Sequence, residues 1–147
     1  MPIIRIIKPN DNTIVGIWKI TENLIFFHKS IRLSSISKQL LENRNSRIHK
    51  LQFLSVRAIL VELGYSDEDL YYKEKRPLLK DGKIISISHS NLFSCVIISD
   101  LKVGIDVQEN NEKIGRIAKK FIGYETSYLT FDDLNRISIV WNIKESI

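Results

Sequence analysis

Residues 84–107 read IISISHSNLFSCVIISDLKVGIDV, three apolar or alternating runs that are separated by Asn91 and by Asp100. Short runs rich in β-branched residues are typical of strands, and asparagine or aspartate between two such runs is typical of a tight turn. The turn-forming pair Asp81-Gly82 stands just before the first run. The stretch therefore predicts an antiparallel meander whose strands cover 84–88, 93–99 and 103–107.

The sequence before the meander predicts a hairpin followed by helices. Residues 3–7 and 13–20 are rich in β-branched residues, and a turn-forming Pro-Asn-Asp-Asn cluster stands between them. After weakly helical stretches flanked by polar residues, residues 48–63 carry dense apolar spacing of the helical type. Gly64 follows, a residue common just past a helix end, so a helix is expected to end there.

The sequence after the meander returns to helical spacing. Residues 113–121 and 132–147 are each expected to form a helix, and in the second of them Leu134, Ile137 and Trp141 share one stripe. The predicted order of elements is therefore a hairpin, helices, a meander and two further helices.

Length and composition indicate one folded domain. The chain has 147 residues and 44% of them are hydrophobic, which is enough for one core and too little for a second full domain. No apolar run reaches the roughly 20 residues needed to span a bilayer, and the first ten residues lack a signal-peptide layout, so we expect a cytoplasmic protein without a membrane partner. Cys95 has no partner cysteine, and its apolar neighbours favour a buried small side chain over a nucleophile.

The charge balance favours anionic partners. Twenty-two Lys and Arg residues against 17 Asp and Glu residues give a formal charge of +5, which would attract nucleic acids, phosphorylated cofactors or acidic proteins. No basic run with interleaved aromatic residues is present, so we expect no nucleic-acid partner. On the predicted central helix, Arg47, Lys50 and Arg57 stack on one face, which either holds phosphate or is a solvated helix surface.

Two carboxylates are candidate metal ligands. Asp106 stands between apolar residues of a predicted strand, where a carboxylate is costly unless it is paired or binds a cation, so a salt-bridged aspartate and a metal ligand are equally open. Glu145 lies four residues after Trp141, at the edge of the packed stripe of the predicted last helix. Together they make a plausible Mg²⁺ site that substrate phosphates would complete.

A histidine flanked by serines stands where the first strand of the meander reaches its turn. Neighbouring residues of a strand point to opposite faces, so Ser88 and His89 cannot readily form the hydrogen bond that activates a nucleophilic serine. We therefore expect His89 to contact a phosphate, with a capping or structural histidine as the alternative.

These fragments stand in an order that resembles the larger, monomeric type of 4′-phosphopantetheinyl transferase, the enzymes that activate fatty-acid, polyketide and nonribosomal-peptide carriers. The five fragments that carry the resemblance are Arg76-Pro77-Leu78, Ile85-Ser86-Ile87-Ser88-His89-Ser90, Val103-Gly104-Ile105-Asp106-Val107, Ile117-Ala118-Lys119-Lys120-Phe121 with Glu125, and Trp141-Asn142-Ile143-Lys144-Glu145-Ser146. The segment Phe53-Leu54-Ser55-Val56-Arg57 also resembles a helix of the family's first half, so the likeness covers most of the chain.

The resemblance implies an α+β fold of two similar halves, each with a helix against a small antiparallel sheet. Coenzyme A would bind in the cleft between the halves. Residues 1–100 would form the first half and residues 101–147 the start of the second, within one domain over 1–147. Because members of the family continue past this point, we expect a truncated second half that leaves the Leu134, Ile137 and Trp141 stripe open for self-association.

The resemblance also implies roles for individual residues. Asp106 and Glu145 would hold Mg²⁺, and Lys144 would contact the phosphates or assist transfer to the carrier serine, which makes these three the expected catalytic residues. Gln108 stands where many members carry a glutamate, and its amide would give Mg²⁺ less charge or act through water.

The expected coenzyme A contacts lie earlier in the chain. Arg76, Ser88 and His89 would bind the nucleotide end, and Arg57 on the helix is a further candidate phosphate contact. The implied activity is holo-acyl-carrier-protein synthesis, with coenzyme A and an acidic carrier protein as partners. A coenzyme A-binding or carrier-binding remnant without catalysis is the alternative, and a basic nucleic-acid-binding module ranks last.

Overall fold

The computed structural model of the chain describes residues 3–90, 92–109, 125–130 and 137–144. The described elements, in chain order, are β1 (Ile3–Asn10), β2 (Thr13–Lys19), α1 (Leu24–Ser30), α2 (Ser35–Glu42), α3 (Arg47–Glu62), η1 (Asp67–Asp69), β3 (Leu70–Lys73), β4 (Arg76–Leu79), β5 (Ile84–Ser90), β6 (Phe93–Ser99), β7 (Lys102–Glu109), β8 (Glu125–Thr130) and β9 (Ile137–Lys144). Helices packed with small antiparallel sheets make this an α+β arrangement.

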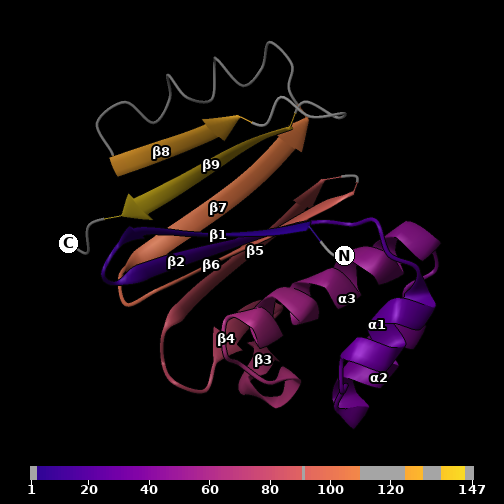
Figure 1. Cartoon of the computed structure of the whole chain (residues 1–147). Helices are drawn as coiled ribbons and strands as arrows, with labels where there is room; N and C mark the ends of the chain where they lie inside the picture. The colour runs from indigo at the N-terminus through magenta and orange to yellow at the C-terminus, as the bar shows by residue number, and fades with distance from the viewer. Residues whose placement is uncertain (1–2, 91, 110–124, 131–136, 145–147) are drawn as a thin grey trace.

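A four-stranded antiparallel sheet in the order β1-β2-β6-β5 forms the middle layer of the molecule. The three helices lie on one side of it, and a second sheet of order β7-β9-β8 lies on the other (Figure 1). The strands β3 and β4 form a separate hairpin beside α3. The expected N-terminal hairpin is therefore confirmed, and its second strand runs into the centre of the sheet.

The middle sheet is covered on both faces, which explains its apolar sequence. Toward the helices, Trp18 and Val96 pack in one buried cluster with Ile59 of α3. Toward the second sheet, Ile97 packs in another buried cluster with Ile105 of β7. All seven residues of β6 are buried, because the strand has neighbours on both sides and on both faces. Cys95 is fully buried within it, as expected, and burial raises the pKa of its thiol.

Helix α3 agrees closely with the helix expected over 48–63. It begins after Ser46, whose side chain accepts a hydrogen bond from the backbone N–H of His49. It ends before Gly64, which has a φ of 93°, a conformation that other residues adopt at a cost. Every residue from 51 to 60 is buried, so the helix packs all round rather than along one stripe.

The prediction that the strand over 103–107 completes a meander beside the strand over 93–99 is wrong. Strand β7 pairs with β9 and not with β6, because β2 and β5 already occupy both edges of β6. An antiparallel strand can pair only where a neighbour has a free edge. The chain therefore leaves the first sheet after Ser99 and begins the second with β7.

The helix expected over 132–147 is also wrong in its described part. Residues 137–144 form β9, a strand that pairs with both β7 and β8. Its sequence ISIVWNIK is dominated by β-branched and aromatic residues, which suit a strand better than a helix. Ile137 and Trp141 thus stand on a strand and not on a helical stripe, whereas Leu134 and the helix expected over 113–121 lie outside the described residues.

Gly16 on β2 allows α3 to approach the sheet, and this gives a first prediction. A Cβ atom at this position would overlap Cγ2 of Ile59 on α3. We expect Gly16→Ala to lower the free energy of unfolding by about 1–3 kcal/mol, as forced packing in a core does. Urea denaturation measures it, with Gly104→Ala as the matched control, because a Cβ at Gly104 meets nothing within 4 Å. Equal changes in the two variants would contradict the close approach.

Candidate functional site

Two serine hydroxyls join the middle sheet to the second sheet. The backbone N–H of Ile105 donates to Ser86 Oγ at 3.3 Å, and the backbone N–H of Val107 donates to Ser88 Oγ at 3.2 Å. The two serines stand two residues apart on β5 and so share one face of that strand. Their hydroxyls take the place of the carbonyls that a neighbouring strand would offer to β7.

Asp106 lies at this junction, next to the serine-histidine motif. Its neighbours Ile105 and Val107 are buried in the cluster under the middle sheet, whereas Asp106 is exposed. Ser88 Oγ, which accepts from Val107, donates to Asp106 Oδ1 at 3.3 Å. The strand thus presents the carboxylate outward at the edge between the two sheets, beside a residue that lies 18 positions earlier in the chain.

His89 lies in a positively charged corner. It is an exposed residue near the end of β5, and its pKa is lowered first by partial desolvation and then by the positive charges of Arg44 and His49. The lowered pKa favours the neutral imidazole, and an anion in this corner would raise the pKa again. No sequence pattern singles out Arg44 or His49, which lie about forty residues before His89 and come near it only through the fold.

Arg76 begins β4, at the end of a two-residue hairpin turn. The turn residues Glu74 and Lys75 have φ values of 53° and 65°, although neither is glycine. Left-handed backbone at two successive non-glycine residues costs free energy, and such strain is common beside functional groups. Arg76 itself is exposed, so its guanidinium is accessible to a ligand.

Arg57 has a different place from the one expected. It is buried, and its Nε donates to Asp67 Oδ1 at 3.3 Å, with 3% and 2% of the two side chains exposed. Arg47 is exposed and Lys50 lines a different hollow, so the three cations do not form one surface. The spacing of the cations did not predict the burial of Arg57, because α3 is enclosed on all sides. Spacing within a helix also does not reveal a buried partner that lies outside it.

The remaining expected metal and catalytic positions are described only in part. Gln108 lies on β7 opposite Ser138, and Lys144 ends β9 opposite Lys102. The side chains of Gln108 and Lys144, and Glu145 as a whole, fall outside the described parts of the structure. Within the described residues no group of three or more His, Cys, Asp or Glu side chains could hold a metal ion. A site completed by Glu145 therefore stays a prediction.

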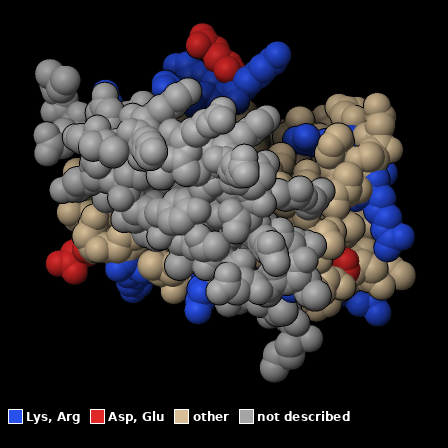
Figure 2. All heavy atoms as spheres, turned by 90° about the horizontal axis from the view of Figure 1, so that it is seen from above, with Lys and Arg blue, Asp and Glu red and all other residues tan. Residues whose placement is uncertain are grey.

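Positive charge on the face seen in Figure 2 is not gathered in one patch. In the view of Figure 2, Lys and Arg side chains lie along several edges of the molecule, with Asp and Glu side chains between them. None of the helices in the described part of the chain is both long and apolar enough to cross a membrane.

Comparison with known proteins adds no assignment, since no protein-family model matches the sequence and a search of curated proteins finds no relative.

Proposed function

We propose that this chain is a Mg²⁺-dependent 4′-phosphopantetheinyl transferase, which moves the phosphopantetheine arm of coenzyme A to a serine of an acyl or peptidyl carrier protein. The observation that carries the proposal is the 3.3 Å hydrogen bond from Ser88 Oγ to Asp106 Oδ1. It joins two of the motifs that resemble the transferase family. The motif around Ser88 is expected to bind the nucleotide, and the motif around Asp106 is expected to bind Mg²⁺. Phosphoryl transfer needs these two functions side by side.

The residues divide this work by their chemistry. Arg76 and His89 donate hydrogen bonds to the phosphates of coenzyme A, and the charges of Arg44 and His49 near His89 favour the same anion. Asp106, with Glu145, would hold Mg²⁺, which when bound supplies positive charge to the phosphates. The carrier serine loses its hydroxyl proton to water as its oxygen bonds to the phosphorus of the phosphopantetheine arm, and the bond from that phosphorus to the nucleotide phosphate breaks, so that the nucleotide leaves with its phosphates. Positioning and charge neutralisation provide most of the catalysis.

A second candidate keeps binding but not catalysis. Position 108, two residues after Asp106 on β7, carries a glutamine whose neutral amide offers Mg²⁺ less than a carboxylate does. This favours a coenzyme A-binding or carrier-binding protein with a weakened metal site.

Mass spectrometry of a carrier protein distinguishes the two candidates. The chain is incubated with coenzyme A, Mg²⁺ and an apo acyl carrier protein, and a mass increase of one phosphopantetheine supports the transferase. A carrier whose acceptor serine is replaced by alanine, and a reaction without Mg²⁺, serve as controls. Binding of coenzyme A without any mass change in the carrier supports the second candidate, and neither binding nor transfer contradicts both.

The charged corner around His89 gives a prediction about coenzyme A binding. A phosphate beside the imidazole raises the pKa that burial, Arg44 and His49 lower, so binding is expected to take up a proton between the two pKa values. Titration calorimetry near pH 6.5, about the ordinary value for histidine, should give enthalpies that depend on the ionisation enthalpy of the buffer.

The matching variant is His89→Ala, for which we expect about tenfold weaker coenzyme A binding and no proton uptake. His28→Ala is the control, since His28 lies exposed on α1 and lines a different hollow. An unchanged dissociation constant and an unchanged buffer dependence in His89→Ala would remove His89 from the site.

A further inference from the structure

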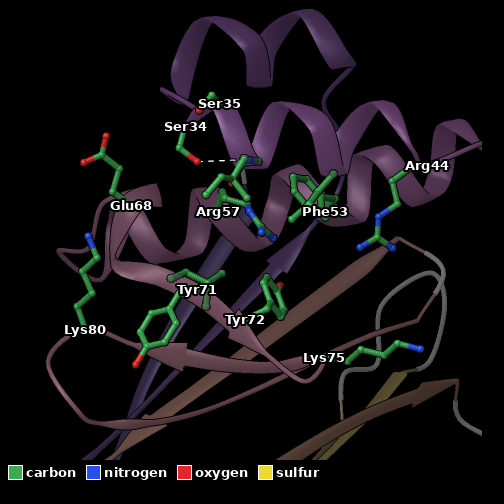
Figure 3. A pocket seen from close by; sticks show the side chains of 14 residues that line it. Ser34, Ser35, Arg44, Phe53, Arg57, Glu68, Tyr71, Tyr72, Lys75 and Lys80 are labelled. Carbon is green, nitrogen blue, oxygen red and sulfur yellow. Dashed lines mark hydrogen bonds between the residues drawn. The ribbon is translucent and has the colours of Figure 1, made fainter.

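A pocket of about 790 Å³ opens between α2, α3 and the β3–β4 hairpin (Figure 3). Its walls are largely apolar and aromatic, with Phe53 from α3, Leu40 from α2, and Tyr71 and Tyr72 from β3. Its volume lies within the roughly 300–1,000 Å³ of small-molecule sites. None of Arg76, Ser88, His89 and Asp106 lines it, although Arg44 lines the pocket and also lies near His89.

A buried arginine with unused donors lies in the wall of this pocket. Arg57 is 3% exposed, its guanidinium carbon lies 3.6 Å from the centre of the Phe53 ring, and its side chain reaches down toward Tyr72 in Figure 3. Its Nε donates to Asp67, but its two Nη groups have no hydrogen-bond partner among the described residues. Buried donors without partners are rare and costly, so these groups point to a ligand that accepts from them.

Asp67 accepts from Arg57 through Nε alone in the described structure, and two further donors share its carboxylate. Its Oδ2 accepts from the backbone N–H of Ser34 at 2.8 Å, and its Oδ1 accepts from Ser37 Oγ at 3.0 Å as well as from Arg57. The carboxylate therefore holds the start of α2 and one edge of the guanidinium. The planar fork of Arg57 is left to bind a second oxyanion from the pocket side.

The charges of the wall favour the same kind of ligand. Arg44 lies over the Phe53 ring at 5.3 Å, and Lys75 and Lys80 also line the pocket, against the single acidic lining residue Glu68. Apolar walls with several cations suit a molecule that carries a negative head on an apolar body. Aromatic rings at Phe53, Tyr71 and Tyr72 favour a body that is flat.

We propose that this pocket binds a small organic anion, with one carboxylate or phosphate head at the Arg57 Nη groups and a planar apolar body between the aromatic side chains. The ligand needs both parts. An oxyanion head alone would leave the apolar walls exposed to water, and an apolar body alone would leave the Arg57 donors unpaired. The site does not involve the expected catalytic residues, and it shares Arg44 with the corner around His89.

Titration calorimetry of the purified chain with matched probes tests the proposal. We expect 4-phenylbutyrate to bind, its neutral analogue 4-phenylbutanamide to bind at least about tenfold more weakly, and acetate not to bind measurably. Comparison of phenyl phosphate with 4-phenylbutyrate identifies the preferred head. Equal binding of the acid and the amide, or of acetate and 4-phenylbutyrate, overturns the proposal, as does binding of a glutamate-rich peptide but of none of the aromatic probes.

Variants locate the binding in this pocket. Arg57→Lys keeps a positive charge beside Asp67 but removes the fork, and Arg44→Gln and Tyr72→Ser alter the wall without touching the buried pair. Each should weaken 4-phenylbutyrate binding severalfold or more, whereas Arg32→Gln, an exposed arginine outside the pocket, should not. Unchanged affinity in Arg44→Gln and Tyr72→Ser overturns the assignment even where Arg57→Lys fails to fold. Displacement of the probe by coenzyme A would overturn the proposal that this pocket binds a ligand of its own.

Discussion

Replacement of Asp67 by alanine is expected to lower the free energy of unfolding by about 3–5 kcal/mol, the cost of leaving one member of a buried ion pair without its partner. Asp67 and Arg57 are almost completely buried, and the carboxylate also accepts from the backbone of Ser34 and from the hydroxyl of Ser37. The change therefore leaves a buried cation and two donors at the start of α2 unpaired at once. Because the free energy of unfolding of a native domain is about 5–15 kcal/mol, this loss is a large fraction of the total stability.

Urea denaturation measures this loss, and two further variants define its cause. Glu68→Gln changes the next residue, which is exposed, and should stay within about 0.5 kcal/mol of the original. Asp67→Asn keeps an acceptor oxygen but removes the charge, so it should fall between the two. If Asp67→Ala and Glu68→Gln were equally stable, the interior would not depend on the Arg57–Asp67 pair.

The elements that the sequence predicts well are those with a strong local signal. The helix ending before Gly64 and the hairpin around the Pro9-Asn12 turn depend on spacing and turn chemistry within a few residues. The errors arise where pairing between distant segments decides the outcome. The meander would have required a free edge on β6, and only the arrival of β2 at that edge shows why β7 belongs to another sheet.

In the candidate site, too, the local motifs could be predicted from the sequence, whereas the contacts between distant segments could not. Ser88, His89 and Asp106 were expected as a set because the order of their motifs resembles that of the phosphopantetheinyl transferases. Their contact could not be derived locally, since it depends on serine hydroxyls that join two sheets. The environment of Arg57 was hidden for a similar reason. A cation on an apolar helix is compatible with a solvated face or a buried pair, and Asp67, ten residues later, decides between them.

Replacement of Asp106 by alanine is expected to reduce transferase turnover by at least about a hundredfold, because the loss of a metal ligand costs more than the 10–100-fold typical of the residues that support ligands. Asp106→Ala leaves Glu145 as the only expected carboxylate, so the ion loses half of the negative charge that the protein is expected to supply beside the substrate phosphates. The carrier mass-shift assay measures it, with Asp100→Ala, an exposed aspartate of the loop before β7, as the control. Equal turnover in the two variants would exclude Asp106 from the reaction.

Gln108→Glu tests the same metal site through a gain in place of a loss. Position 108 lies two residues after Asp106 on β7, so alternation gives both positions the same face of the strand. A second negative charge there should tighten Mg²⁺ binding, and without metal it should destabilise the fold slightly, because two like charges are brought together. Thermal unfolding with coenzyme A and increasing Mg²⁺ measures both effects, and the variant should gain more stability from Mg²⁺ than the original chain does. An equal response would place position 108 away from the ion, and no response in either protein would contradict a Mg²⁺ site at Asp106.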